Sequence, residues 1–143
     1  MTKQIFTIVK EKKEDLPQKP TLGEFCLTML HQGTNSHLIH LQTKSHPEHK
    51  VLQKFYRRVV EKADDIIEMW QGVNAPQIID YPDTWIPPMD NGLDDIVRFR
   101  DYLDANRDVL GDNSGLQAQM DDMMELVNAV VYKESRFVEK KGP

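Results

Sequence analysis

The stretch SHPEHKVLQKFYRRVVEKADDIIEMWQG, residues 45–72, decides the fold. Its first four residues form a capping box, in which the Ser45 hydroxyl accepts from the amide of Glu48 and the Glu48 carboxylate reaches back. Pro47 is tolerated in the first turn of a helix, and Gly72 is a typical helix end. The apolar residues between these signals share an arc of ~60° on a helical wheel, and they are Leu52, Phe55, Val59, Ala63, Ile66 and Trp70. The stretch is therefore predicted to form one long amphipathic helix with a buried apolar face.

Another helix is expected just before this one. TLGE, residues 21–24, is also a capping box, and apolar residues follow it with helical spacing. We expect this helix to run from Thr21 to about Gln42. Because only about three or four residues separate the two helices, they must form an antiparallel hairpin.

Residues 72–91, GVNAPQIIDYPDTWIPPMDN, hold four prolines and break the helical period. About twenty extended residues span up to ~65 Å, whereas a helix of about 25 residues is ~37 Å long. The segment can therefore run the full length of a bundle and begin the next helix at the far end. Its large apolar residues are expected to pack against the bundle, and they are Ile78, Ile79, Tyr81, Trp85 and Ile86.

Two further helices are predicted after this connection. The third covers residues 91–110 and is stopped by Gly111, and the fourth begins at the SGLQ capping box, residues 114–117, and extends to about Phe137. Their expected buried positions are Leu93, Ile96, Phe99 or Arg100, Leu103, Leu116, Met120, Met123 or Met124, Val127, Val130 and Val131.

The order hairpin, long crossover, hairpin predicts an all-α fold, a ferritin-like four-helix bundle with its long crossover between the second and third helices. We expect one domain over residues 21–138. An N-terminal arm, residues 1–20, precedes it, and its QIFTIV stretch is a candidate strand or docking segment. Residues 139–143 are expected to form a disordered tail.

Composition argues against several functions. The 143 residues include one cysteine, Cys26, which rules out an intrachain disulfide and a Cys-based zinc cluster. No run of ~18 apolar residues is present, and the N-terminus has no apolar region of secretory length, so we expect a cytoplasmic protein without a membrane span. The net charge of -5 argues against nucleic acid as a partner.

The five histidines all lie between His31 and His49. The predicted hairpin turn places His40, at the end of the first helix, near His49, at the start of the second. Asp64 and Glu68 lie one turn apart on the same flank of the second helix as His49. Imidazole and carboxylate groups together suit iron, zinc or manganese. Since His49 and Asp64 are about 22 Å apart along one helix, they can share an ion only if two chains pack with these helices antiparallel.

The same flank carries Tyr56, Val60 and Ile67, which the apolar stripe of the intrachain core does not require. A flank that mixes apolar residues with candidate ligands is typical of a second contact surface. The sequence therefore predicts a homo-oligomer that contains at least a two-fold dimer.

The run HLQTKSHPEHKVLQKFYRRVVEKADDIIEMWQG, residues 40–72, resembles the mini-ferritin family of starvation-induced DNA-binding proteins (Dps). This resemblance implies a ferroxidase centre across a two-fold interface, with His40, His49, Asp64 and Glu68 as the matching iron ligands. The chain resembles still more closely a group of phage-encoded Dps-like proteins without an assigned function. These share the HLQTKS…H…FY…QG pattern and an ending like LVNAVVYK, over roughly residues 21–137.

Two departures from the Dps pattern leave the activity open. An acid is expected four residues after His49, and this chain has Gln53, which offers one neutral carbonyl oxygen. The loop between His40 and His49 is also about three residues shorter. The alternative is a phage-encoded interaction protein, whose bundle binds a host or virion protein and whose flank is an ordinary dimer surface. A DNA-binding arm is disfavoured because acidic residues are interspersed with its lysines.

Overall fold

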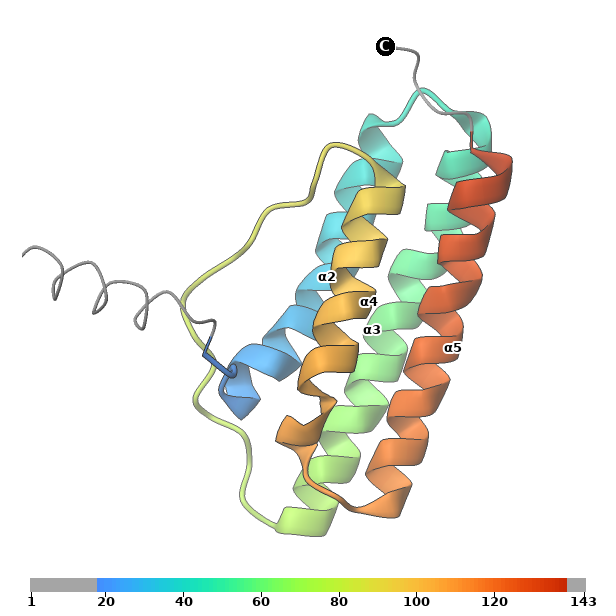
Figure 1. Cartoon of the computed structure of the whole chain (residues 1–143). Helices are drawn as coiled ribbons and strands as arrows, with labels where there is room; N and C mark the ends of the chain where they lie inside the picture. The colour runs from blue at the N-terminus through green and yellow to red at the C-terminus, as the bar shows by residue number, and fades with distance from the viewer. Residues whose placement is uncertain (1–17, 139–143) are drawn as a thin grey trace, which may run out of the picture.

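The computed structural model of the protein describes residues 18–138, which fold into an all-helical bundle (Figure 1). The α-helices of this range are α2 (Leu22–Gln42), α3 (His46–Asn74), α4 (Gly92–Asn106) and α5 (Ser114–Phe137), and a short 3-10 helix, η1 (Arg107–Leu110), follows α4. The prediction of an all-α bundle is confirmed. The predicted tail, and the predicted arm apart from residues 18–20, lie outside the described range.

The helices form two antiparallel hairpins, α2–α3 and α4–α5 (Figure 1). Figure 1 shows residues 75–91, the crossover, running outside the bundle from the end of α3 back to the opposite end, where α4 begins. That end holds the α2–α3 turn, the start of α4 and the last turns of α5, and we refer to it as the upper end. Among residues 18–138, no helix combines the length and hydrophobicity needed to span a bilayer.

The first two helices begin where their capping residues predict. The Thr21 hydroxyl accepts from the amide of Glu24 (3.1 Å), and the Ser45 hydroxyl accepts from the amide of Glu48 (3.2 Å). The amide of Ser45, however, donates to the Thr43 hydroxyl (3.1 Å). The Glu48 carboxylate is therefore not needed at the cap, and this side chain is buried in the bundle instead.

The start of α5 differs from the prediction, because Asn113 and not Ser114 is the capping residue. The Asn113 side chain accepts from the amide of Leu116 (3.1 Å). Asn and Ser are about equally good N-caps, so the pattern alone cannot decide between neighbouring candidates. The capping box fails because Gln117 Oε1 accepts from the Arg107 guanidinium (2.7 Å), which joins η1 to α5.

Two other helix ends are also shifted. α3 continues through Gly72 to Asn74, since a single glycine inside a helix costs only about 1 kcal/mol. The predicted third helix is α-helical to Asn106 and becomes η1 for its last turn. Gly111, with a φ of 89°, then ends it as predicted.

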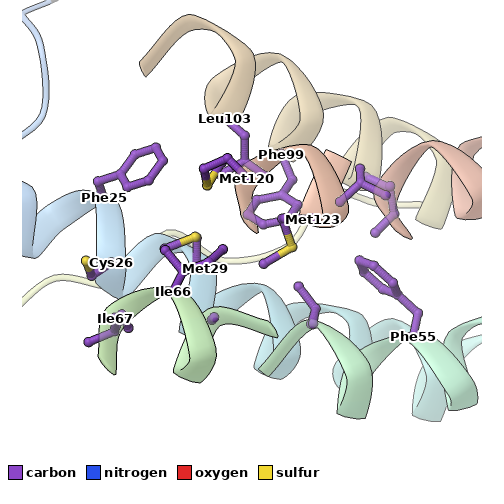
Figure 2. Packing of buried hydrophobic residues seen from close by; sticks show 14 of the residues in the cluster. Phe25, Cys26, Met29, Phe55, Ile66, Ile67, Phe99, Leu103, Met120 and Met123 are labelled. Carbon is purple, nitrogen blue, oxygen red and sulfur yellow. The ribbon is translucent and has the colours of Figure 1, made fainter. Parts of the chain in front are cut away.

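A continuous hydrophobic core lies between the four α-helices (Figure 2). Figure 2 shows Met29, Ile66, Phe99 and Met123, one residue from each helix, among the side chains that meet there. The sequence leaves open whether Phe99 or Arg100, and whether Met123 or Met124, faces the core. Phe99 and Met123 are buried, whereas Arg100 and Met124 are partly exposed. Each fully buried side chain of this size contributes about 1.5–3 kcal/mol, so this core is the main source of stability.

The crossover is bound to the bundle mainly by hydrogen bonds. Of its large apolar residues only Ile78 is buried, and Ile79 is 85% exposed, so the prediction that all of them pack inward is wrong. The Trp85 indole donates to Asn35 Oδ1 (2.9 Å), and the Asn35 amide donates to the carbonyl of Ile86 (3.0 Å). These bonds fix the segment without covering its apolar side chains, since Trp85 and Ile86 both stay exposed.

Candidate functional site

The α2–α3 turn holds a reciprocal pair of histidines. His40 Nδ1 lies 2.8 Å from the carbonyl oxygen of His49, and His49 Nδ1 lies 3.0 Å from the carbonyl oxygen of His40. The rings stack with centroids 3.8 Å apart and an angle of 21° between their planes. His40 is buried and His49 is partly exposed. The short turn thus brings these two side chains together, as its length predicts.

These hydrogen bonds fix the tautomer of both rings. A carbonyl oxygen only accepts, so each Nδ1 must carry a hydrogen. In the neutral ring Nε2 then has a free lone pair, and the ring orientation is held by the other nitrogen. Metal-binding histidines are commonly held in this way, with one nitrogen on a carbonyl and the other on the ion.

Two more aromatic groups extend the pair. The His37 ring stacks on the Tyr56 ring with centroids 4.0 Å apart, and His40 is tilted against Tyr56 at 5.3 Å. The Arg57 guanidinium lies 5.6 Å from the centroid of the Tyr56 ring, within cation–π range. Three histidines and a tyrosine therefore form one aromatic cluster between α2 and α3, on the flank that the sequence predicts to mix apolar residues with candidate ligands.

The two carboxylates predicted to complete the site lie elsewhere. Asp64 and Glu68 are exposed, one turn apart on α3. Fifteen residues of helix separate Asp64 from His49, which is about 22 Å. Within residues 18–138, no three His, Cys, Asp or Glu side chains are grouped so that they could hold a metal ion. A site that combines the histidine pair with these carboxylates needs two chains, and it stays a prediction.

The stacked rings also limit how the histidine pair could bind metal. An imidazole binds an ion in its own ring plane, about 2.0–2.1 Å from the nitrogen. Two planes at 21° whose centroids are 3.8 Å apart meet only on the order of 10 Å away. In this arrangement each Nε2 serves a separate ion or hydrogen-bond partner, and His49 must turn away from His40 before both could bind one ion.

The predicted second contact surface is narrower than expected. Ile67 is only 8% exposed and belongs to the intrachain core, because α2 covers this part of α3. Val60 is 39% exposed, and it packs on Gly33, where a Cβ would clash with it. Tyr56 is partly covered by His37, and Gln53 is exposed. Val60, Gln53 and the aromatic cluster therefore remain as the outer face of this flank.

A buried carboxylate pair at the upper end was not predicted. Glu48 of α3 and Glu134 of α5 are 7% and 3% exposed, and both approach Gly92 of α4. A Cβ on Gly92 would lie 2.8 Å from Glu134 Oε1 and 2.8 Å from Glu48 Oε2. Burial, with a hydrogen bond to Glu48 and its charge, raises the pKa of Glu134 from 4.5 to about 9. The pair therefore holds a proton at neutral pH.

A third buried acid, Asp95 of α4, is fully hydrogen-bonded. One of its oxygens accepts from the Gln32 side chain (2.8 Å), and the other accepts from the Met89 amide (2.9 Å) and the Arg98 guanidinium (3.0 Å). Asp95 thereby joins α4 to α2 and to the end of the crossover. Sequence could have flagged it, and Glu134 as well, because both fall at helical spacing on the apolar stripe of their own helix.

The single cysteine offers no reactive thiol. Cys26 is fully buried in α2, and burial, with a smaller contribution from the charge of Asp80, raises its pKa to about 12. A protonated thiol is a poor nucleophile and a poor metal ligand. This agrees with the absence of a Cys-based pattern in the sequence.

A comparison with protein families gives one match, which covers residues 40–133, about two thirds of the chain. The matching description is a family of unknown function, DUF5856. The chain belongs to this family. The DUF5856 match includes the α2–α3 turn and all four predicted ligand residues, but its description assigns no activity, so the Dps-like role and the phage origin stay predictions. Searches of curated proteins and of solved structures gave no match.

Proposed function

We propose that this protein is the subunit of a Dps-like, metal-binding homo-oligomer built on a ferritin-like bundle. The observation that carries the proposal is the histidine pair, whose Nδ1 atoms are held by carbonyl oxygens so that each Nε2 is free. Once His49 has turned away from His40, both histidines of one chain would bind the ion together with Asp64 and Glu68 of a second copy. The full-length crossover between two antiparallel hairpins supports the ferritin-like part of the proposal (Figure 1).

The donor set suits iron, and zinc or manganese can also occupy such a site. In the iron case, the ferrous ion is the substrate, and a ferroxidase-like reaction would pass its electron to dioxygen or peroxide as the oxidant and leave a ferric ion for storage. The imidazoles supply neutral nitrogen ligands, and the carboxylates supply the negative charge that holds the oxidised ion. Gln53 removes one charge from this set, so we expect one ion per half-site and weaker binding than at a full ferroxidase centre.

The experiment is a measurement of metal content and of mass in solution, on protein purified without chelator. His49→Ala and Asp64→Ala should each abolish binding, because they remove ligands from opposite sides of the same intersubunit site. When the two variants are mixed and allowed to exchange subunits, half of the sites in a mixed dimer keep all four ligands and should bind again.

Matched controls are available on the same helix. His46→Ala removes an exposed histidine from the same turn as His49, and Glu61→Gln removes an exposed acid close to Asp64. Both should leave the metal content unchanged. If neither His49→Ala nor Asp64→Ala lowers it, the metal site does not exist.

An interaction or scaffold protein is the second candidate, and the exposed crossover favours it. The crossover exposes several large apolar side chains, which are Ile79, Tyr81, Trp85, Ile86 and Met89. Contiguous exposed apolar side chains often mark a binding site for another protein. The resemblance to phage proteins suggests a host or virion protein as this partner. A stable heteromeric complex that Ile86→Ser disrupts, together with metal-free protein, would favour this candidate over the first.

A further inference from the structure

A groove with a volume of about 580 Å³ lies between α2, α4 and the crossover. Each of these three elements contributes an apolar or aromatic side chain that is at least partly exposed, and these are Leu27, Tyr102 and Ile86. Glu24 and Asn35 also line the groove, and eleven residues of α2 from one to the other measure about 17 Å. The groove is therefore long and narrow enough to hold a segment of extended chain.

The hydrogen-bonding groups of the groove are largely used by the protein itself. The Thr28 hydroxyl donates to the carbonyl of Glu24 (2.7 Å) and accepts from the Tyr102 hydroxyl (3.4 Å). The Gln32 amide donates to Asp95 (2.8 Å). The surface that remains is mainly apolar, with the exposed Glu24 side chain at one end. Such a groove suits an apolar segment that carries a positive charge at the Glu24 end.

The described part of the chain begins at this same end of the groove. Gln18, Lys19 and Pro20 line it, next to the start of α2. The Lys19 ammonium donates to the carbonyl of Ala105 (2.6 Å) and to Asp108 (2.8 Å), which ties this segment to the end of α4. Residues 1–17 are therefore attached to the bundle at the rim of the groove.

The residues before Gln18 include an apolar run of matching length. This run is part of the QIFTIV stretch, the candidate docking segment of the sequence, and Lys10 follows it directly. Five steps of extended chain, from Lys10 back to Ile5, span about 17 Å, which equals the distance from Glu24 to Asn35. Apolar side chains alternate to both faces of this run, and they are Ile5, Phe6, Ile8 and Val9. A groove walled by helices on one side and by the crossover on the other can cover both faces.

The connection to Gln18 allows this run to fold back into the groove of its own chain. Nine residues of extended chain lead from Val9 to Gln18 and reach up to about 30 Å, more than the length of the groove. A connection this short also gives a tethered segment an effective concentration on the order of millimolar at the groove. Its own groove is therefore the favoured site for the run.

We propose that residues 5–9 occupy this groove as an extended segment of the same chain, with Lys10 beside Glu24 and Ile5 level with Asn35. The apolar side chains of the segment cover the apolar walls, and the Lys10 ammonium neutralises the carboxylate at the end of the groove. The proposal is independent of the metal site, because the groove residues do not include the predicted ligands His40, His49, Asp64 and Glu68.

The test is disulfide trapping in the full chain. Three extended steps from Lys10 to Thr7 and seven residues of α2 from Glu24 to His31 both measure about 10 Å, so Thr7 lies level with His31. The pair Thr7→Cys, His31→Cys should therefore form an intrachain disulfide under oxidised glutathione. Cys26 is fully buried and is present in every variant, so it does not contribute to the difference.

A second cysteine pair is the matched control. Thr7→Cys with Ala129→Cys places the second thiol at an exposed position, in a cleft between α3 and α5. The His31 pair should close at least tenfold faster than this control, measured by loss of free thiols and by a faster-migrating monomer on a non-reducing gel. Equal rates would overturn the proposal. Disulfide-linked dimers in place of the intrachain product would also overturn it, because they would assign the segment to another copy.

Substitutions in the segment test its apolar contacts. Phe6→Asp with Ile8→Asp, introduced into the His31 trapping pair, should slow closure at least fivefold, because two charges would have to enter the apolar groove. Glu14→Gln lies in the connection and should leave the rate unchanged. An unchanged rate in the Asp variant would overturn the proposal, since chance collisions of a tethered segment do not depend on apolar side chains.

A charge exchange tests the direction of the segment. Glu24→Lys should slow closure of the His31 trapping pair about threefold, because it places a second positive charge beside Lys10. Adding Lys10→Glu restores the opposite charges and should restore the rate. A merely structural effect of Glu24→Lys on the start of α2 would persist in the exchanged variant, and such persistence would contradict the assigned direction.

Discussion

Asp95 and Glu134 are both buried acids on the apolar stripe of a helix, but their surroundings differ. Asp95 receives three hydrogen bonds, one of them from a guanidinium. Both carboxylate oxygens of Glu134 are buried without a conventional donor among residues 18–138, and only the carboxyl of Glu48 lies beside them. The comparison shows that position on the stripe does not decide what a buried acid does, because its surroundings determine whether its oxygens accept hydrogen bonds, as those of Asp95 do, or lack a donor, as those of Glu134 do.

Removing the satisfied acid should have the largest effect. Asp95→Ala leaves the Gln32 amide, the Met89 N–H and the Arg98 guanidinium without their acceptor. We expect a loss of about 3–5 kcal/mol in the free energy of unfolding, measured by urea denaturation. Asp94→Ala, an exposed acid in the same turn, is the control and should cost less than about 1 kcal/mol. A similar loss in both variants would show that the hydrogen bonds of Asp95 do not contribute more to the free energy of unfolding than an exposed acid does.

The unsatisfied acid should appear in the pH dependence of stability. Glu134 binds its proton more tightly in the folded chain than in the unfolded chain, so its favourable contribution is complete below pH 4.5 and is lost as the pH rises toward about 9. The loss is at most about 1.4 kcal/mol per pH unit, or about 2–3 kcal/mol between pH 6 and pH 8. Thermal and urea unfolding of Glu134→Gln should show a much flatter profile. An identical profile in wild type and variant would contradict the assignment.

Gly92 tests how closely the two acids approach α4. Gly92→Ala places a methyl group against both carboxylates and should cost about 1–2 kcal/mol by overpacking. In the double variant Gly92→Ala, Glu134→Ala, part of this cost should disappear, because the crowding side chain is gone. Gly72→Ala is the matched control, since nothing lies within 4 Å of its added Cβ, and it should be neutral or slightly stabilising. Additive losses in the double variant would argue against direct contact.

The smallest effect should come from the other member of the pair. Glu48→Gln removes the neighbouring carboxylate that helps to raise the pKa of Glu134, but it also removes an acidic side chain from the first turn of α3, where the helix dipole favours one. These opposing effects should leave a net change within about 1 kcal/mol at pH 7, measured by urea denaturation. A net change well outside this range would contradict the expected balance of the two effects.

Sequence predicts the helices and their pairing well because both depend on local rules. The Thr21 and Ser45 caps, the stripe from Leu52 to Ile66 and the short turn after Gln42 each act over a few residues. The errors occur at two kinds of position. In the first, two adjacent residues are equally good N-caps, as Asn113 and Ser114 are. In the second, a neighbouring helix or loop determines whether a side chain is buried. The sequence predicts Ile67 on an outer surface, but the folded bundle buries it in the core cluster.

The candidate sites were predictable in part. The length of the turn brings His40 and His49 together, but their stacking and mutual hydrogen bonds depend on side-chain rotamers that no spacing rule contains. The Glu48–Glu134 pair joins residues 86 positions apart in the sequence, so it follows only from the course of the crossover. The crossover in turn presents most of its apolar residues outward, since the Trp85 and Asn35 hydrogen bonds replace packing as its attachment.

The crossover also has a consequence for the order of folding. Each hairpin contains mostly contacts that are local in the sequence, which form quickly, whereas docking of one hairpin on the other must close a long loop first. The bundle can therefore be regarded as two helical hairpins, α2–α3 and α4–α5, that are joined by a long linker. Since Ile79 is 85% exposed in the middle of that linker, a chain cut there should still reassemble from its two halves, with an affinity set by the interhelical core.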